Sequence, residues 1–289
     1  MTIRALRTLI SIHQNGSFRA AAEAEHLTPS AVSHQMKNLE QSLGFDIFDR
    51  TPKQPVLNAK GFALVDRAEV LVRDCDNLGA DLTSGDDLAG ELVLGAVPTT
   101  LTGLVPIALA GLRKRHPALT VRLVPGLTND LLLQLDRGLI QAAVISRPQV
   151  LPPKLGFTEI ATEQLMLLSS DQEETTDPIE LLKNRPFIRF TRDAVVGKII
   201  EAWLQKHDIR VAEVMELAGL DAISSMVTNG LGVSIVPRGL QDTRRDLPLK
   251  WTPLEEDSPV RTIGVASRQA SVNPKVLDAL CSELVSAGR

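Results

Sequence analysis

Residues 28–44, TPSAVSHQMKNLEQSLG, decide the fold of the first part of the chain. Thr28 can cap a helix, and Pro29 suits its first turn because proline has a preset φ and no N–H to leave unpaired. Apolar residues then recur at helical spacing (Val32, Met36, Leu39, Leu43) until Gly44 ends the helix. The opposite face is polar (Ser30, Ser33, His34, Lys37, Gln41). This pattern predicts an amphipathic helix with a polar outer face.

Two short helices are expected before this one. Apolar residues from Ile3 to Ile10 share one face after a capping Thr2, Gly16 ends that helix, and Ser17 can cap the next. Residues 45–57 contain two prolines and two basic residues, which is typical of a short ribbon or wing. The sequence therefore predicts a domain of three short helices and a wing over residues 1–58.

A long helix, capped by Asn58, is expected to run to about Thr83. One face carries a coiled-coil seam: Leu64, Ala68, Leu71, Cys75, Leu78 and Leu82. The seam has two interpretations, self-association or a helix lying on its own domain's core, and its charged flanks favour self-association. Residues 59–88 are predicted to be a linker and dimerisation helix followed by a polar hinge.

Beyond the hinge, apolar strands alternate with amphipathic helices, which indicates a parallel sheet with crossover connections. Residues 89–289 are therefore expected to form one α/β domain. Its strands are predicted at 91–97, 120–124, 142–145, 164–169, 187–190, 232–236 and 261–266, and its helices at 103–116, 129–137, 197–207, 221–229 and 273–286.

Composition excludes several classes of protein. The 289 residues are 44% hydrophobic and 23% charged, as in ordinary globular chains, and the net charge is −4. The first 60 residues hold seven basic and five acidic side chains, so the N-terminal part is the basic one. Cys75 and Cys281 fit no metal-ligand spacing, which favours a reduced, cytoplasmic protein. Leu92 to Leu112 is uncharged, but its two prolines favour strand, turn and helix over a membrane span.

The ordered motifs of the N-terminal part resemble the LysR-type transcriptional regulators. They are the runs at 15–18, 21–22, 30–36, 39–40, 43–44 and 57–61, with Phe48 and Arg50. The resemblance continues at Asp130, Leu131, Leu135 and Gly138, and in residues 229–233 with Pro237. It implies a winged helix-turn-helix, a linker helix and a two-lobed effector domain like periplasmic binding proteins. Lobe I is expected at about 89–162 and 267–289, and lobe II at about 163–266.

This resemblance assigns the polar face of the second helix-turn-helix helix to the DNA major groove. The candidate contacts are Thr28, Ser30, Ser33, His34 and Lys37, with Arg50 and Lys53 from the wing. Arg50 has a second interpretation, a structural tie between wing and body. Pro29 stands where the family commonly has glutamine, so one potential base contact is absent.

Candidate effector contacts follow the ends of strands. Thr99, Thr100 and Thr128 precede or begin helices, where hydroxyls and free amides suit anions, although plain helix capping explains them equally well. Phe190 and Thr191 join them by family analogy, and Arg147 and Arg192 could add positive charge. We therefore expect a small organic anion between the lobes, and no cofactor or metal.

The alternative functions are a cytosolic ligand-binding protein or an enzyme without specific DNA binding. No metal-binding helix motif, nucleotide-binding glycine pattern or nucleophile elbow occurs in the sequence, so no catalytic residues are assigned. The expected partners are double-stranded promoter DNA, a small organic anion and further copies of the chain as a homodimer or homotetramer. RNA polymerase is a further candidate partner, and no membrane is expected.

Overall fold

The structure is a computed structural model that describes residues 1–51, 55–83, 88–239, 247–254, 258–268 and 273–288, with no side-chain description over 77–83. The chain separates into two compact units, Met1–Asp86 and Asp87–Arg289. Within the described residues, no helix is both long and apolar enough to cross a membrane.

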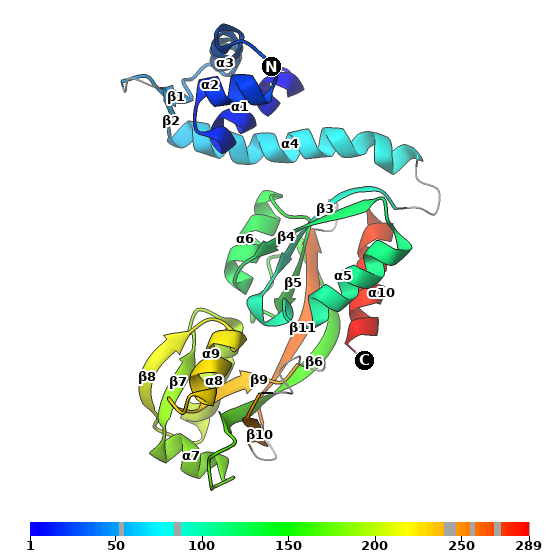
Figure 1. Cartoon of the computed structure of the whole chain (residues 1–289). Helices are drawn as coiled ribbons and strands as arrows, with labels where there is room; N and C mark the ends of the chain where they lie inside the picture. Colours follow the sequence, from blue (N-terminus) through cyan, green and yellow to red (C-terminus); the bar gives the residue numbers. More distant parts are fainter. Residues whose placement is uncertain (52–54, 84–87, 240–246, 255–257, 269–272, 289) are drawn as a thin grey trace. The chain divides into compact units, whose positions relative to one another are not determined.

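The N-terminal unit is a winged helix-turn-helix, as predicted. Its elements are α1 (Ile3–Asn15), α2 (Phe18–Ala24), α3 (Pro29–Leu43), β1 (Phe48–Asp49) and β2 (Val56–Leu57) (Figure 1). The hydroxyls of Thr2, Ser17 and Thr28 each accept a backbone N–H in the first turn of the following helix. Gly16 and Gly44 end α1 and α3 at positive φ, 73° and 76°, where glycine has no steric penalty. The predicted caps are therefore confirmed.

The long helix α4 (Ala59–Thr83) starts as predicted, because the Asn58 side chain accepts the backbone N–H of Gly61 at 2.9 Å. Its first turns pack on the core of the N-terminal unit through Val65 and Ala68, which are buried, and through the partly buried Leu64. Leu71 is 48% exposed and Cys75 is also exposed. The predicted seam is therefore divided: Ala68 belongs to the unit's own core, and Leu71 and Cys75 face outward. The seam positions Leu78 and Leu82 lie outside the residues whose side chains are described.

The C-terminal unit is built on a seven-stranded sheet that is mixed, where the sequence predicted a parallel one. Strands β3 (Gly90–Ala96), β4 (Leu119–Pro125) and β5 (Ala142–Ser146) pair in parallel. Strands β6 (Leu155–Ser170) and β11 (Val260–Arg268) pair antiparallel with each other, and β9 (Ser234–Pro237) and β10 (Leu249–Pro253) pair antiparallel with β6. The prediction failed for β6 and β11 because a strand's apolar pattern does not encode the direction of its partner.

Two lobes form around this sheet. Lobe I holds β3, β4 and β5 with α5 (Leu104–Arg115), α6 (Thr128–Arg137) and α10 (Pro274–Ala287). Lobe II holds β7 (Pro186–Phe190), β8 (Ala212–Leu217), α7 (Pro178–Asn184), α8 (Val195–Lys206) and α9 (Leu220–Thr228), with β9 and β10. Strands β6 and β11 run through both lobes (Figure 1). The strands β8 and β10 and the helix α7 were not anticipated from the sequence.

The lobe boundary predicted on the C-terminal side was wrong. Residues 163–266 were assigned to lobe II, but Ile263 and Val265 lie in the same buried cluster as Leu92, Leu94 and Val144 of lobe I. Their strand, β11, pairs with β5 of lobe I from Ile263 to Ser267. Most of β11 therefore belongs to lobe I.

Candidate functional site

The polar face of α3 is fully available at the surface of the N-terminal unit. Ser30, Ser33, His34 and Lys37 are all exposed and lie at positions i, i+3, i+4 and i+7, which share one side of a helix. The Thr28 hydroxyl accepts the N–H of Ala31 at 3.2 Å, so its first role is to cap α3. The structure thus brings five of the predicted DNA contacts to one surface.

Arg50 is tied into the body of this unit. Its Nη2 lies 2.6 Å from Oε2 of Glu40, whose side chain is 7% exposed. The other carboxylate oxygen of Glu40 accepts the backbone N–H of Ile47 at 2.9 Å and of Phe48 at 3.2 Å. Glu40 therefore anchors the start of the wing to α3, and its pairing with Arg50 favours the structural interpretation of Arg50. The other predicted wing contact, Lys53, lies outside the described residues.

The C-terminal unit has a small pocket lined by residues of both lobes, which we call the interlobe pocket. It encloses about 20 Å³, and its lining residues are Val97, Pro98, Thr99, Leu127, Thr128, Ser146, Phe190, Ala194, Val195, Val196, Ala218 and Arg261. Helices α6 of lobe I and α8 of lobe II both begin at this pocket, and neither has a side-chain cap. Their first-turn N–H groups are therefore available to an anion.

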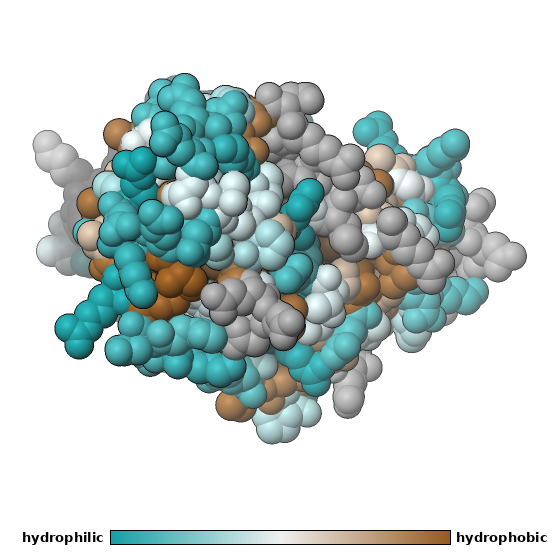
Figure 2. Space-filling model, turned by 90° about the horizontal axis from the view of Figure 1, so that it is seen from below, coloured by the Kyte–Doolittle hydropathy of each residue, from teal (hydrophilic) through white to brown (hydrophobic). Residues whose placement is uncertain are grey.

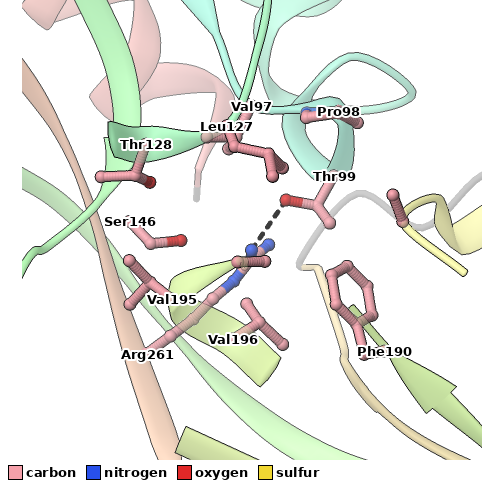
Figure 3. A pocket seen from close by; sticks show the side chains of 12 residues that line it. Val97, Pro98, Thr99, Leu127, Thr128, Ser146, Phe190, Val195, Val196 and Arg261 are labelled. Atoms are coloured by element: carbon pink, nitrogen blue, oxygen red, sulfur yellow. Dashed lines mark hydrogen bonds between the residues drawn. The ribbon is translucent and has the colours of Figure 1, made fainter. Parts of the chain in front are cut away.

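Arg261 is the charged group of the interlobe pocket. In Figure 3 its side chain extends from β11 into the space between Thr99, Thr128 and Ser146. It is 1% exposed, its Nη2 lies 2.5 Å from Oε2 of Glu163, and its Nη1 donates to the Thr99 hydroxyl at 2.7 Å. Burial lowers the pKa of the guanidinium, and the Glu163 carboxylate opposes that shift. Glu163 balances the charge of Arg261, so the pocket offers an anion the remaining guanidinium N–H groups and two uncapped helix starts.

The structure divides the predicted effector contacts into two groups. Thr99, Thr128 and Phe190 line the interlobe pocket. Thr100 does not, because its hydroxyl donates to the Val97 carbonyl at 2.8 Å. Thr191 donates to Glu216 at 2.9 Å and also lies outside the pocket lining. Thr128 was expected to cap α6, but the cap position is Leu127 and Thr128 is the first helical residue.

The two predicted arginines of the cleft are engaged elsewhere. Arg147 pairs with Glu159 and is absent from the pocket lining. Arg192 donates to Glu216 at 2.7 Å and to Glu213 at 2.6 Å, and these bonds raise its pKa. The cation of the interlobe pocket is Arg261, which sequence reasoning placed only in a strand.

Two signals in the sequence point toward the residues that were missed. Arg261 opens an otherwise apolar strand, and a charged side chain there needs a partner when buried. Ser146 ends β5 at the same sheet edge as Pro98 and Leu127. The pairing of Arg261 with Glu163, however, joins residues 98 positions apart and depends on strand register. Among the described residues, no group of three His, Cys, Asp or Glu side chains could hold a metal ion.

Comparisons with known proteins agree with this architecture. Residues 3–62 match the model of the bacterial regulatory helix-turn-helix protein, lysR family, and residues 85–289 match the LysR substrate binding domain. A probable RuBisCO transcriptional regulator of Guillardia theta is 29% identical over 297 residues, covering 99% of this chain and 94% of that protein.

Two solved structures have a similar fold. Full-length CbnR complexed with its target DNA aligns with a TM-score of 0.75 and 19% identity, covering 99% of this chain and 100% of CbnR. The effector binding domain of QuiR in complex with shikimate aligns with a TM-score of 0.60 and 18% identity, covering 69% of this chain and 97% of that domain. The winged helix-turn-helix, the two-lobed C-terminal unit and the two family matches together show that this chain belongs to the LysR-type transcriptional regulators, which are DNA-binding regulators and not enzymes.

Proposed function

We propose that this LysR-type regulator binds specific duplex DNA through the exposed face of α3, and that a small organic anion in the interlobe pocket modulates this activity. The observation that carries the effector proposal is the buried Arg261 guanidinium beside the uncapped starts of α6 and α8. Because the two helices come from different lobes, a ligand that contacts both favours one arrangement of the lobes over others.

The chemistry of the lining favours an anion over a neutral ligand. An anion would accept from the Thr128 and Ser146 hydroxyls and from helix N-terminal amides, and would interact with Arg261. QuiR, whose effector domain has a similar fold, was solved with shikimate, a carboxylate at neutral pH. At about 20 Å³ the pocket holds little more than one water molecule. An organic acid would therefore have to separate the lobes or shift the lining side chains, which couples binding to a change of shape.

The effector proposal can be tested by titrating full-length protein with a panel of small carboxylates while its thermal unfolding is followed. Thr128→Val keeps the shape of the side chain and removes its hydroxyl. We expect it to weaken binding about tenfold or more, the value of one hydrogen bond to a charged group. Thr120→Val, an exposed threonine on the edge strand β4, is the matched control. Equal affinities of wild type and Thr128→Val would exclude the pocket.

The DNA proposal is tested by Lys37→Ala. Lys37 is exposed on the α3 face, and a lysine that meets phosphate contributes to affinity for every duplex. We expect weaker binding to operator and non-operator DNA alike, with the slope of log K against log salt reduced by about one unit. Lys183→Ala, on α7 in the C-terminal unit, is the control. An unchanged affinity and slope would remove Lys37 from the interface.

The outward-facing part of α4 supports self-association. Leu71 and Cys75 continue the heptad seam beyond the turns that pack on the N-terminal core, and within the described part of the N-terminal unit they are exposed and lie outside that core. We place a homodimer contact there, consistent with a symmetric regulator that reads two half-sites. LysR-type regulators are a bacterial family that acts on promoter DNA, and we therefore propose that this chain acts in the cytoplasm.

A further inference from the structure

A second, larger cavity opens beside the interlobe pocket, and we call it the outer groove. It measures about 720 Å³, within the range of small-molecule sites. One wall is a stripe of α8 that includes Val195, Lys198, Ile199 and Trp203, and the other is formed by residues 147–150 and 259–262. The walls come from both lobes, as in the interlobe pocket.

The outer groove and the interlobe pocket are neighbours that share part of their lining. Val195 and Arg261 line both cavities, and Asn129 of the groove follows Thr128 of the pocket in α6. From Val195 the groove continues along α8 to Lys206, about 16 Å at 1.5 Å per residue. Because Arg261 lines both cavities, a ligand that reaches Arg261 lies next to the groove.

The charge of the outer groove is positive. Its lining contains Arg147, Lys198, Lys206 and Arg261 and no Asp or Glu. Arg147 is paired with Glu159, and Arg261 with Glu163. Lys198 is exposed, and within the described part of the chain it has no carboxylate within 4.0 Å. The ammonium group of Lys198 is therefore available to a ligand anion.

Apolar surface lies between these charges. Val150 is 81% exposed and Val260 is 55% exposed, and both line the groove opposite Ile199. Trp203 is 4% exposed, and its indole N–H has no hydrogen-bond partner among the described residues. The face of the molecule in Figure 2 shows apolar residues in separate patches among polar ones. The outer groove thus combines apolar lining residues with the exposed ammonium group of Lys198.

We infer that the effector is an organic acid with two anionic ends joined by an apolar spacer. One end binds in the interlobe pocket near Arg261, the spacer lies against Ile199 and Val260, and the second end pairs with Lys198. This inference rests on the proposed function, because it assumes that the first end binds in the interlobe pocket.

Trp203 provides a probe at the site itself. The chain has two tryptophans, so Trp251→Phe leaves Trp203 as the only one. Full-length Trp251→Phe protein is titrated with succinate, adipate and suberate, and in parallel with butyrate, hexanoate and octanoate, while the Trp203 emission is recorded. We expect one or more diacids to bind about fivefold more tightly than the matched monoacid, the strength of a partly screened charge pair. That advantage should shrink as salt is raised.

Lys198→Gln in the same background should remove the diacid advantage and leave monoacid binding unchanged. Lys183→Gln, an exposed lysine on α7, should leave both unchanged. If monoacids bind as tightly as diacids, or if Lys198→Gln preserves the difference, the two-ended effector is refuted while the proposed anion site stands. If neither series binds the wild-type pocket, both the proposed site and this inference are refuted.

Discussion

The ion pair between Arg261 and Glu163 should behave as one strongly coupled element of the C-terminal unit. The two residues are direct cross-strand partners on β11 and β6, the strands that pass through both lobes. Their side chains are 1% and 7% exposed, and Nε and Nη2 of Arg261 lie 2.6 and 2.5 Å from the same carboxylate oxygen. Glu163→Gln leaves a buried guanidinium without its counter-charge. We expect it to lower the free energy of unfolding by about 3–5 kcal/mol.

The double variant Glu163→Leu with Arg261→Met should be far less damaging. Removing both charges also removes both desolvation costs, and apolar residues of similar volume can fill the space. We expect its free energy of unfolding to be within about 1 kcal/mol of wild type, or above it. Native proteins have unfolding free energies of about 5–15 kcal/mol. The single variant would therefore lose a large share of its stability, and the double variant little.

Urea unfolding followed by tryptophan fluorescence measures this cycle in the intact chain. Trp203 and Trp251 both lie in the C-terminal unit, so the signal reports that unit and not the helix-turn-helix. Linear extrapolation gives the unfolding free energy of wild type, of the single variants Glu163→Leu and Arg261→Met, and of the double variant. Additive losses, with the double variant as unstable as the sum of the singles, would refute the coupled pair. A stable double variant would also lack the pocket cation, and it should bind no carboxylate.

Three further predictions concern other contacts of the chain. Glu40→Ala should destabilise the N-terminal unit by about 1–3 kcal/mol, because two buried wing amides lose their acceptor. Arg50→Ala removes a half-exposed side chain and should cost about 1 kcal/mol or less. Equal losses of the two variants in thermal unfolding would contradict this prediction. Leu71→Glu should weaken self-association in analytical ultracentrifugation, and Leu123→Glu, at an exposed position of β4, is the control. An unchanged dissociation constant of the Leu71→Glu oligomer would exclude that face of α4 from the contact. Arg189, with Arg192, lowers the pKa of Glu213, so this carboxylate stabilises the fold at neutral pH and the stabilisation is lost as pH falls below about 4.3, the ordinary value for Glu. Glu213→Gln should therefore flatten the acid side of the stability profile, and an unchanged slope of urea midpoint against pH would count against the pairing.

The sequence by itself determined the local features of this protein. Thr2, Ser17 and Thr28 begin helices and Gly16 and Gly44 end them, because caps act within one turn and need no distant partner. The same ordered motifs identified the LysR-type family and the exposed face of α3. Contacts that lie within about ten residues, such as the cap of α4 by Asn58, were predictable in this way.

Tertiary structure alone decided which side chains meet in the interlobe pocket. Thr99 and Thr100 are neighbours of the same type, but the first accepts from Arg261 and the second is turned to its own backbone. Arg261 reaches Glu163 across 98 residues because β11 runs antiparallel to β6 in one particular register. Hydrophobic periodicity specifies which face of a strand is buried, and it carries no information about the partner strand or its register. The helix-turn-helix could therefore be predicted almost to the residue, whereas the pairing of Arg261 in the interlobe pocket could be found only in the folded chain.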